Sequence, residues 1–200
     1  MLKLFLSTLL LTGSLLTIQA QTVEDYFLPE APINKVDYST PESSMTTSKF
    51  YTVKDSIIIV QDSNFVQGEY LSTEVKTFLV VNNEIHLIRS EFFYGKYAPK
   101  IYDFDTAQVT LKIPAKKDTI TWTSVDPIKG TINYSASWRV TEKNNEKFTL
   151  LRVAKSVDYT KVKEVEFYAE KIGLLKTEVV TSDGSGLTKL RLERMSYVPE

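Results

Sequence analysis

The residues best suited to chemistry in this chain are few and scattered. Asp103 and Asp105 flank Phe104, so on a strand the two carboxylates would share one face and lie close together. Such a pair could bind Ca²⁺, or could act as acid and base, or acid and nucleophile, in glycoside hydrolysis. It is also typical of the solvated face of an edge strand, and this second interpretation is the one we favour.

The single histidine, His86, alternates with Ile85 and Leu87, which predicts a solvent-facing position on a strand. No neighbouring pattern supplies partners for a metal site, and no GxSxG elbow accompanies the histidine for a hydrolase triad. The run Asp183–Gly186 lacks the lysine of a phosphate loop and is typical of a hairpin turn. The sequence therefore predicts no catalytic residue, no metal ligand and no cofactor site.

Export is predicted by the first twenty residues. Lys3 is followed by an uncharged run from Leu4 to Ile18, and Ala20 is a small residue at a suitable cleavage point. The run is shorter than the roughly 20 apolar residues that span a bilayer. We expect a signal peptide over residues 1–20, a mature N-terminus at Gln21 and a soluble periplasmic or extracellular protein.

The amino-acid composition excludes several classes of partner and of chemistry. The chain has 200 residues, a net charge of −1 and no cysteine. Near-neutral charge offers no electrostatic footprint for nucleic acid, and the missing cysteines exclude thiol catalysis, zinc–thiolate sites and disulfides. No later segment is long and apolar enough to span a membrane, so we expect no membrane span in the mature chain.

Strands dominate the rest of the chain. The clearest alternation has apolar residues at every second position, namely Ile132, Tyr134, Ala136, Trp138 and Val140. Turn residues such as Asn82-Asn83 and Asn144-Asn145 separate neighbouring strands at short intervals, which favours hairpins. Residues 162–172 fit helical as well as strand spacing, and we favour a strand. The prediction is an all-β fold, a curved antiparallel sheet or incomplete barrel of roughly eight to eleven strands built as a meander of hairpins.

Residues 21–47 are expected to form an extended lead-in to an antiparallel β domain over 48–200. The lead-in contains Pro29, Pro32 and Pro41, and a short strand is predicted over 35–39. Because proline removes a backbone donor, the lead-in is expected to follow an edge of the sheet or its surface.

Four aromatic residues are predicted on buried faces: Trp122, Tyr134, Trp138 and Phe167. They could belong to a packed core or could line an apolar cavity in an incompletely closed barrel. We expect Trp122 and Trp138 to face the same concave side, because the positions between their apolar neighbours are polar.

Three stretches resemble small exported β-proteins of Bacteroidetes-type bacteria. They are Tyr26–Val36 (YFLPEAPINKV), Ile113-Pro114 followed by Trp122, and Phe167–Glu178 (FYAEKIGLLKTE). The second departs from the family pattern, because Lys117-Asp118 stands near the usual glycine. The family's shape is similar to the curved half-barrels of periplasmic lipid and lipoprotein carriers. The resemblance implies a fold and an exported location, and it transfers no catalytic residue.

The leading hypothesis is a non-enzymatic exported protein that binds an apolar ligand or an envelope partner on the concave face of the sheet. One alternative is a structural or interaction module whose interior is filled by its own side chains. The other is a carboxylate-dependent hydrolase that uses Asp103 and Asp105. A hollow concave side would favour the first hypothesis, and several carboxylates with perturbed pKa values in one cleft would favour the last.

Overall fold

The structure is a computed structural model that describes residues 21–40, 43–115, 118–126, 130–143, 146–157, 162–182 and 187–194. The predicted leader over residues 1–20 and the predicted turns at Asn144-Asn145 and Asp183–Gly186 lie outside the described residues. Within those ranges the chain forms α1 (Val23–Phe27), β1 (Lys35–Ser39), β2 (Met45–Lys54), β3 (Ile57–Val66), β4 (Glu69–Val81), β5 (Glu84–Tyr94), β6 (Lys100–Lys112), β7 (Thr119–Asp126), β8 (Gly130–Lys143), β9 (Glu146–Val157), β10 (Val162–Ala169), β11 (Gly173–Ser182) and β12 (Leu187–Arg194).

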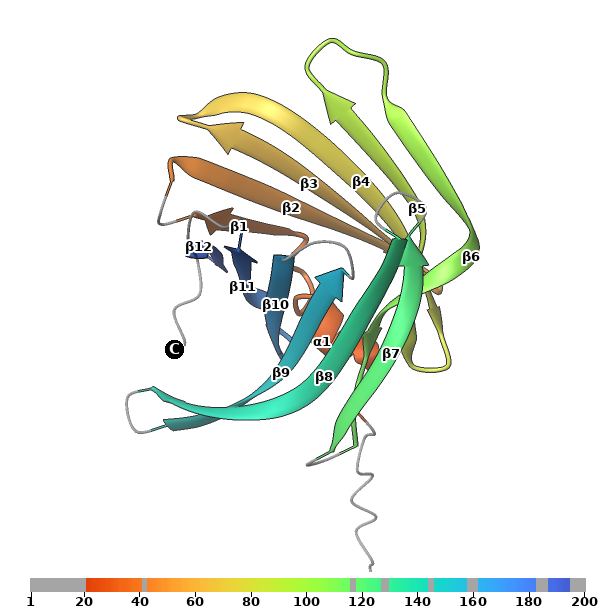
Figure 1. Cartoon of the computed structure of the whole chain (residues 1–200), viewed down its shortest axis with the longest axis vertical. Coiled ribbons are helices and arrows are strands. Elements are labelled where there is room, and N and C mark those ends of the chain that lie inside the picture. Colours follow the sequence, from red (N-terminus) through yellow and green to blue (C-terminus); the bar gives the residue numbers. More distant parts are fainter. Residues whose placement is uncertain are drawn as a thin grey trace, which may run out of the picture.

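The twelve strands form one antiparallel sheet in the order β6-β5-β4-β3-β2-β1-β12-β11-β10-β9-β8-β7. The sheet curves strongly and encloses an interior space, with β6 and β7 at its two ends (Figure 1). The predicted fold, a curved antiparallel meander that forms an incomplete barrel, is confirmed. The strand count slightly exceeds our estimate.

The two edge strands, β6 and β7, contact each other through side chains. No backbone ladder joins β6 to β7 in the described part of the chain. Instead, Trp122 Nε1 and Ser124 Oγ both donate to the Val109 carbonyl at 2.9 Å, and Gln108 Nε2 donates to the Val125 carbonyl at 2.8 Å. This seam keeps the two halves of the curved sheet together without closing the ladder.

The lead-in takes a different course from the predicted one. The predicted strand is present as β1, but β1 pairs with β2 on one side and with β12 on the other, so it lies inside the sheet order and not at an edge. Pro29 and Pro32 precede β1 and Pro41 follows it. Because no proline lies within the strand, its backbone donors stay free for pairing on both sides.

The short helix α1, which we did not predict, closes one end of the interior. The backbone N–H and the hydroxyl of Thr22 both donate to Asp25 Oδ2, and this contact organises the first turn. Val23 and Tyr26 are buried, and the Val23 N–H donates to Asn83 Oδ1 in the turn between β4 and β5. We call this the closed end, and the opposite end, with the turns β1–β2, β3–β4 and β5–β6, the open end.

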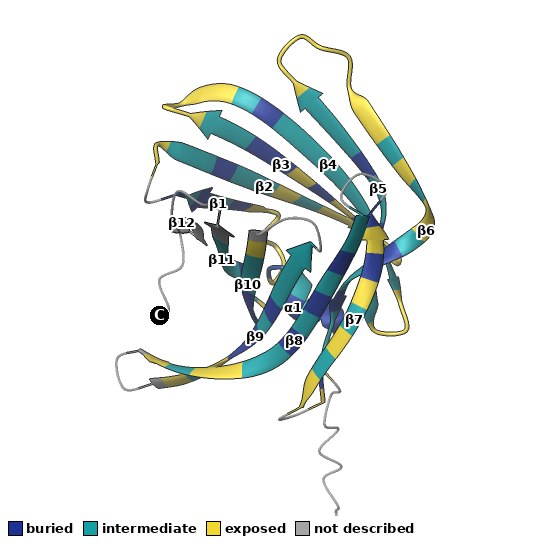
Figure 2. Ribbon diagram, in the orientation of Figure 1, coloured by how far each residue is buried: buried dark blue, intermediate teal, exposed yellow. Residues whose placement is uncertain are grey.

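The main core lies on the concave face and includes α1. Figure 2 shows buried residues on the helix and on strands that surround it. Two ring contacts connect the helix to the sheet: Tyr26 meets Trp138 edge to face at 5.4 Å between centroids, and Phe27 meets Phe78 at 5.0 Å. The closed end is therefore filled by aromatic side chains from the lead-in.

Several local predictions are confirmed. Asn82 and Asn83 both adopt positive φ in the β4–β5 turn, and residues 162–169 form a strand, β10. Gly173 starts β11 at φ +80°, and the register shift in this pair of strands falls between Phe167 and Tyr168 of β10.

Candidate functional site

The concave side of the sheet contains a cavity of about 670 Å³. This volume falls within the range of sites for small ligands. Side chains from α1, from β2 to β6 on one wall and from β7 to β11 on the other line it. Along β3 the inward positions run from Ile58 near the closed end through Val60 to Asp62 and Asn64, so the lining changes from apolar to polar with distance from α1.

Apolar residues flank the polar ones on both sides. Toward the closed end the lining consists mainly of Phe27, Val60, Phe78, Leu87, Leu111, Tyr168 and Leu174. Toward the open end the second wall contributes Ile132, Val157 and Val179. The charged residues therefore form a belt between an apolar region at the closed end and a mixed region at the open end, where Thr47, Asn64 and Asp126 also line the cavity.

One half of the belt lies on β2, β3 and β4. Lys49 Nζ contacts both carboxylate oxygens of Asp62 at 2.7 Å, and Lys76 Nζ lies 3.5 Å from Asp62 and 2.8 Å from Glu74. Ser90 also donates to Glu74 at 3.0 Å. Register explains the cluster, because Asp62 pairs directly with Lys49 on one neighbouring strand and with Glu74 on the other.

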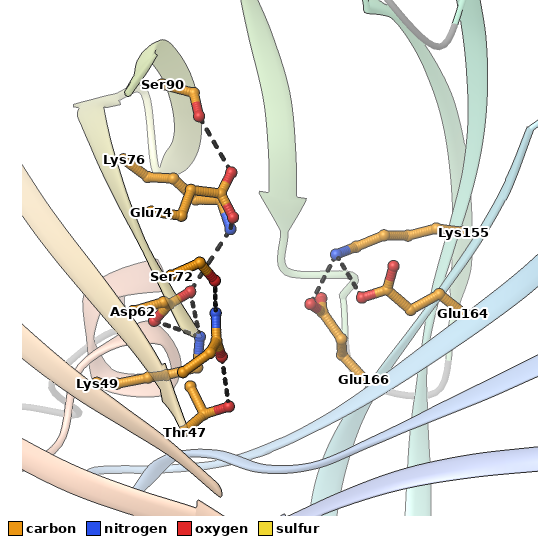
Figure 3. Close-up of polar contacts among 11 residues, drawn as sticks. Thr47, Lys49, Asp62, Ser72, Glu74, Lys76, Ser90, Lys155, Glu164 and Glu166 are labelled. Carbon is orange, nitrogen blue, oxygen red and sulfur yellow. Dashed lines mark hydrogen bonds and ion pairs between the residues drawn. The ribbon is translucent and has the colours of Figure 1, made fainter. Parts of the chain in front are cut away.

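The other half lies on β9 and β10. Lys155 Nζ is 2.6 Å from Glu166 and 3.5 Å from Glu164, so one ammonium serves two carboxylates. The Tyr168 hydroxyl donates to Glu166 at 2.7 Å. Figure 3 shows this cluster and the Lys49–Asp62–Lys76 cluster on facing walls, with their polar groups directed toward the space between them.

The pKa values reflect this pairing. Burial alone would raise the pKa of Asp62, but Lys49 and Lys76 outweigh burial and hold that pKa below its usual value. Burial lowers the pKa of Lys76, yet Asp62 and Glu74 outweigh it, so the pKa of Lys76 is raised. The same balance with Glu164 and Glu166 raises the pKa of Lys155. Both lysines and Asp62 are therefore charged at neutral pH.

The belt remains accessible to water and to a ligand. The side chains of Glu74, Lys76, Lys155 and Glu164 are all partly exposed, although they face the interior. Lys155 lies near enough to Lys76 for its positive charge to oppose the protonation of Lys76. Charges from opposite walls thus act on the same space.

Two threonines of the lining differ in their hydrogen bonds. Thr47 Oγ1 donates to Asn64 Oδ1 at 2.8 Å, and Asn64 Nδ2 in turn donates to Ser72 Oγ at 3.2 Å. Thr40 Oγ1 is buried and has no hydrogen-bond partner among the residues that the structure describes. An orphaned hydroxyl in a cavity wall can bond to an occupant of that cavity.

Several carboxylates gather in this cavity, but their pairing with lysines favours ligand binding over glycoside hydrolysis. Five acidic residues line it, and four of them contact a lysine ammonium, namely Asp62, Glu74, Glu164 and Glu166, while the fifth is Asp126 of β7. A glycosidase acid needs a raised pKa, whereas the pKa of Asp62 is lowered. Fixed, paired charges of this kind suit the orientation of a polar ligand group.

The structure brings only one of the four predicted lining residues to the cavity. Tyr134 lines it, and burial raises the pKa of its phenol to about 12. Trp122 stacks on Tyr134 at 5.1 Å and Trp138 packs on Tyr26, so both tryptophans are partly buried against the core without lining the cavity. Phe167 lies outside the cavity, in a separate cluster with Leu150 and Ala169.

Phe167 is buried, as predicted, but on the face opposite the cavity, because β10 carries large residues on both faces. Glu166 and Tyr168 point into the cavity, which puts Phe167 on the opposite side, near Lys176 Nζ at 4.6 Å from the ring centroid. Val140 departs from prediction as well: it ends the apolar series of β8 but is 64% exposed.

The residues first considered for chemistry lie away from the cavity. Asp103 and Asp105 are exposed on β6, and Asp103 pairs with Arg89 at 2.8 Å. His86 Nε2 lies 3.1 Å from Glu84 Oε2, and the ring is half-buried. Across the described ranges, no group of three or more His, Asp or Glu side chains is arranged to hold a metal ion.

Solved structures provide two comparisons. One is a "putative exported protein with YmcC-like fold" from Bacteroides fragilis, with 8% identity, coverage of 84% of this chain and 97% of that one, and a TM-score of 0.44. The other is a "putative lipoprotein" from Parabacteroides distasonis, with 13% identity, the same coverages and a TM-score of 0.40. No family model and no curated protein matches the chain.

No helix within the described residues is long and apolar enough to cross a membrane.

The charged belt was missed from sequence, although a signal for it exists. On β9 the inward series is Leu151, Val153, Lys155 and Val157, so a lysine interrupts an apolar series. Asp62 interrupts the series on β3 in the same way, after Ile58 and Val60. A charge at an inward position of an alternating strand indicates either an ion pair or a functional site.

Proposed function

We propose that this chain is an exported binding protein that takes up a small amphipathic molecule in its concave cavity. The observation that carries the proposal is the charged belt beside an apolar region within a cavity of about 670 Å³. The polar group of the ligand would contact the belt at Lys76 and Lys155, and its apolar part would lie against the flanking side chains. The leader expected over residues 1–20 supports the exported location.

This proposal modifies the sequence hypothesis of a purely apolar ligand. A hydrocarbon alone would leave the partly exposed ammonium and carboxylate groups of the belt without water, which is unfavourable. A ligand with a polar or charged group replaces that water with new hydrogen bonds. The cavity itself favours a carrier over a module with a filled interior, because space for a ligand is present.

Uptake of a fluorescent fatty acid provides the first test. We expect saturable binding by the wild type and a loss of at least tenfold in affinity for Val60→Trp, which fills the cavity. Ile59→Trp is the matched control, because Ile59 is the adjacent aliphatic residue of β3 and is exposed. Thermal melting of both variants shows whether each remains folded.

Competition tests the belt without changing the protein. Fatty acid, fatty alcohol and alkylamine of one chain length should displace the probe better than the alkane. Equal displacement by the alkane would contradict a role for the belt, and absence of saturable uptake, or equal uptake by Val60→Trp, would contradict the proposed function.

A further inference from the structure

The β5–β6 hairpin carries a row of exposed aromatic side chains. The rings of Phe92 and Tyr94 are 6.5 Å apart with planes 10° from parallel, and those of Tyr94 and Tyr97 are 6.3 Å apart at 17°. Tyr94 is 48% exposed and Tyr97 68%, and Ile101, which pairs with Glu91 on the other face of the hairpin, is 47% exposed. This grouping is larger than the scattered single apolar residues that are normal on a soluble surface.

The same hairpin is basic. Lys96 and Lys100 are exposed between the apolar residues, and residues 94–101 include no acidic side chain. Tyrosine and lysine together are typical of segments that lie at a bilayer surface, because the tyrosine ring occupies the headgroup region while lysine attracts anionic lipid.

The hairpin is also free to reach a flat surface. In Figure 1 it extends past the ends of the neighbouring strands, away from α1. Alternate turns of a meander lie at the same end of the sheet, so this hairpin shares the open end with the β3–β4 turn. That turn is flanked by two more exposed apolar residues, Val66 and Tyr70.

We propose that the β5–β6 hairpin docks the protein on an anionic lipid bilayer, with Tyr94, Tyr97 and Ile101 in the headgroup region and Lys96 and Lys100 on the lipid phosphates. Docking by this hairpin turns the open end toward the lipid and keeps α1 away from it. The proposal does not depend on the cavity ligand, since Tyr94 and Tyr97 do not line the cavity.

The absence of cysteine from the chain allows a direct test. Tyr97→Cys receives an environment-sensitive fluorophore, and vesicles of phosphatidylcholine with or without about one third phosphatidylglycerol are added. We expect a blue shift and protection from an aqueous quencher with the anionic vesicles. The same label at Val53→Cys, an exposed position on β2, should remain in water.

Vesicle sedimentation measures affinity with unlabelled protein. Tyr94→Ser with Tyr97→Ser should weaken binding to anionic vesicles at least tenfold, and Lys96→Gln with Lys100→Gln should remove the preference for anionic lipid. The control pair, Phe50→Ser with Val53→Ser, changes exposed apolar residues of β2 and should bind like the wild type. Residues 1–20, where retained, are common to all variants and cannot cause a difference between them.

Fatty acid uptake by the Tyr94→Ser, Tyr97→Ser variant should equal that of the wild type, which separates docking from cavity binding. The proposal is overturned if that variant sediments with vesicles as well as the wild type does. It is equally overturned if the label at position 97 stays in water with vesicles, and protection of that label by a soluble polysaccharide instead would assign the surface to carbohydrate.

Discussion

The closed end and the open end of the interior differ in how far side chains fill the space. At the closed end, α1 inserts Tyr26 and Phe27 against Trp138 and Phe78, and the interior is packed. Further along the same strands, charged side chains replace apolar ones and a cavity remains. The sheet is continuous through both regions, so the presence of an inserted segment decides whether the interior is filled.

The packed closed end and the charged belt also differ in how much they contribute to the stability of the fold. Packing of aromatic rings at the closed end stabilises the fold directly. Ion pairs between partly buried groups contribute little net stability, because desolvation offsets their attraction, and apolar replacements are often as stable. The belt formed around Asp62 and Lys155 is therefore not explained by stability, which supports a role in binding.

The largest effect is expected at the closed end. Trp138→Ala removes the ring contact with Tyr26 and the hydrogen bond from Nε1 to the Pro114 carbonyl, and should lower the free energy of unfolding by about 3 kcal/mol. Fatty acid affinity should stay within about twofold of the wild type, because Trp138 does not line the cavity. Denaturant unfolding and probe titration measure the two quantities.

Val140→Ala is the control for that change. Val140 lies two residues further along β8 but is exposed, so the substitution should alter stability by less than about 0.5 kcal/mol. If Trp138→Ala weakened uptake while leaving stability intact, the division between a packed end and a binding end would be wrong.

A smaller loss of stability is expected from a substitution in the charged belt. Asp62→Asn leaves Lys49 and Lys76 without their shared carboxylate and should cost about 2 kcal/mol at pH 7. Because the folded-state pKa of Asp62 is lowered, its contribution is present above the unfolded pKa of about 3.9 and is lost as pH falls through the lower folded value.

Unfolding measured from pH 7 to pH 3 shows this dependence. The wild type should lose more stability below about pH 4 than Asp62→Asn does. Asp103→Asn is the control for the loss of a carboxylate, since Asp103 pairs with Arg89 at the surface, where an ion pair contributes little to stability. Parallel pH curves for the wild type and Asp62→Asn would mean that the pair does not act as described.

The closed end also depends on a close backbone approach, which a matched pair of glycines can isolate. Gly173 has φ +80°, and a Cβ there would lie 3.3 Å from backbone atoms of Phe27, Leu28 and Pro29. Gly68 at the open end has φ +83° and nothing within 4 Å. Both alanine variants share the conformational strain, so Gly173→Ala should cost about 1 kcal/mol more than Gly68→Ala in denaturant unfolding. Equal losses of stability would show that α1 and the segment after it move away from the added methyl group at little cost.

Much of the sheet could be predicted because its signals are local. Alternation in β8 and the Asn82-Asn83 turn depend on neighbouring residues, and both are present as predicted apart from Val140. The helix α1 is only one turn long, so periodicity could not reveal it, although Thr22 and Asp25 have the spacing of a capping box.

The candidate site was less predictable because it depends on register between strands. Lys49, Asp62 and Lys76 lie on three strands, and their contact requires the pairing of each strand with the next. Alternation alone also does not say which face of a strand is concave. Glu166 and Phe167 show this on β10, where the charged residue faces the cavity and the aromatic one does not.

The smallest expected effect compares Thr40 and Thr47, two of the threonines in the cavity wall. Thr40 Oγ1 is buried without a hydrogen-bond partner in the described part of the chain, whereas Thr47 Oγ1 donates to Asn64. Thr40→Val keeps the shape and removes an unsatisfied group, so it should stabilise the protein by about 0.5 kcal/mol, while Thr47→Val should cost about 1 kcal/mol.

The fatty acid affinity of the Thr40→Val variant tests whether the Thr40 hydroxyl contacts the bound molecule. If the Thr40 hydroxyl bonds to the bound molecule, Thr40→Val should weaken fatty acid binding several-fold while it raises the melting temperature. A stabilised variant with unchanged affinity would place the polar group of the ligand elsewhere along the belt. A destabilised Thr40→Val would show that the hydroxyl contributes to the folded state, and the contrast between the two threonines would then be wrong.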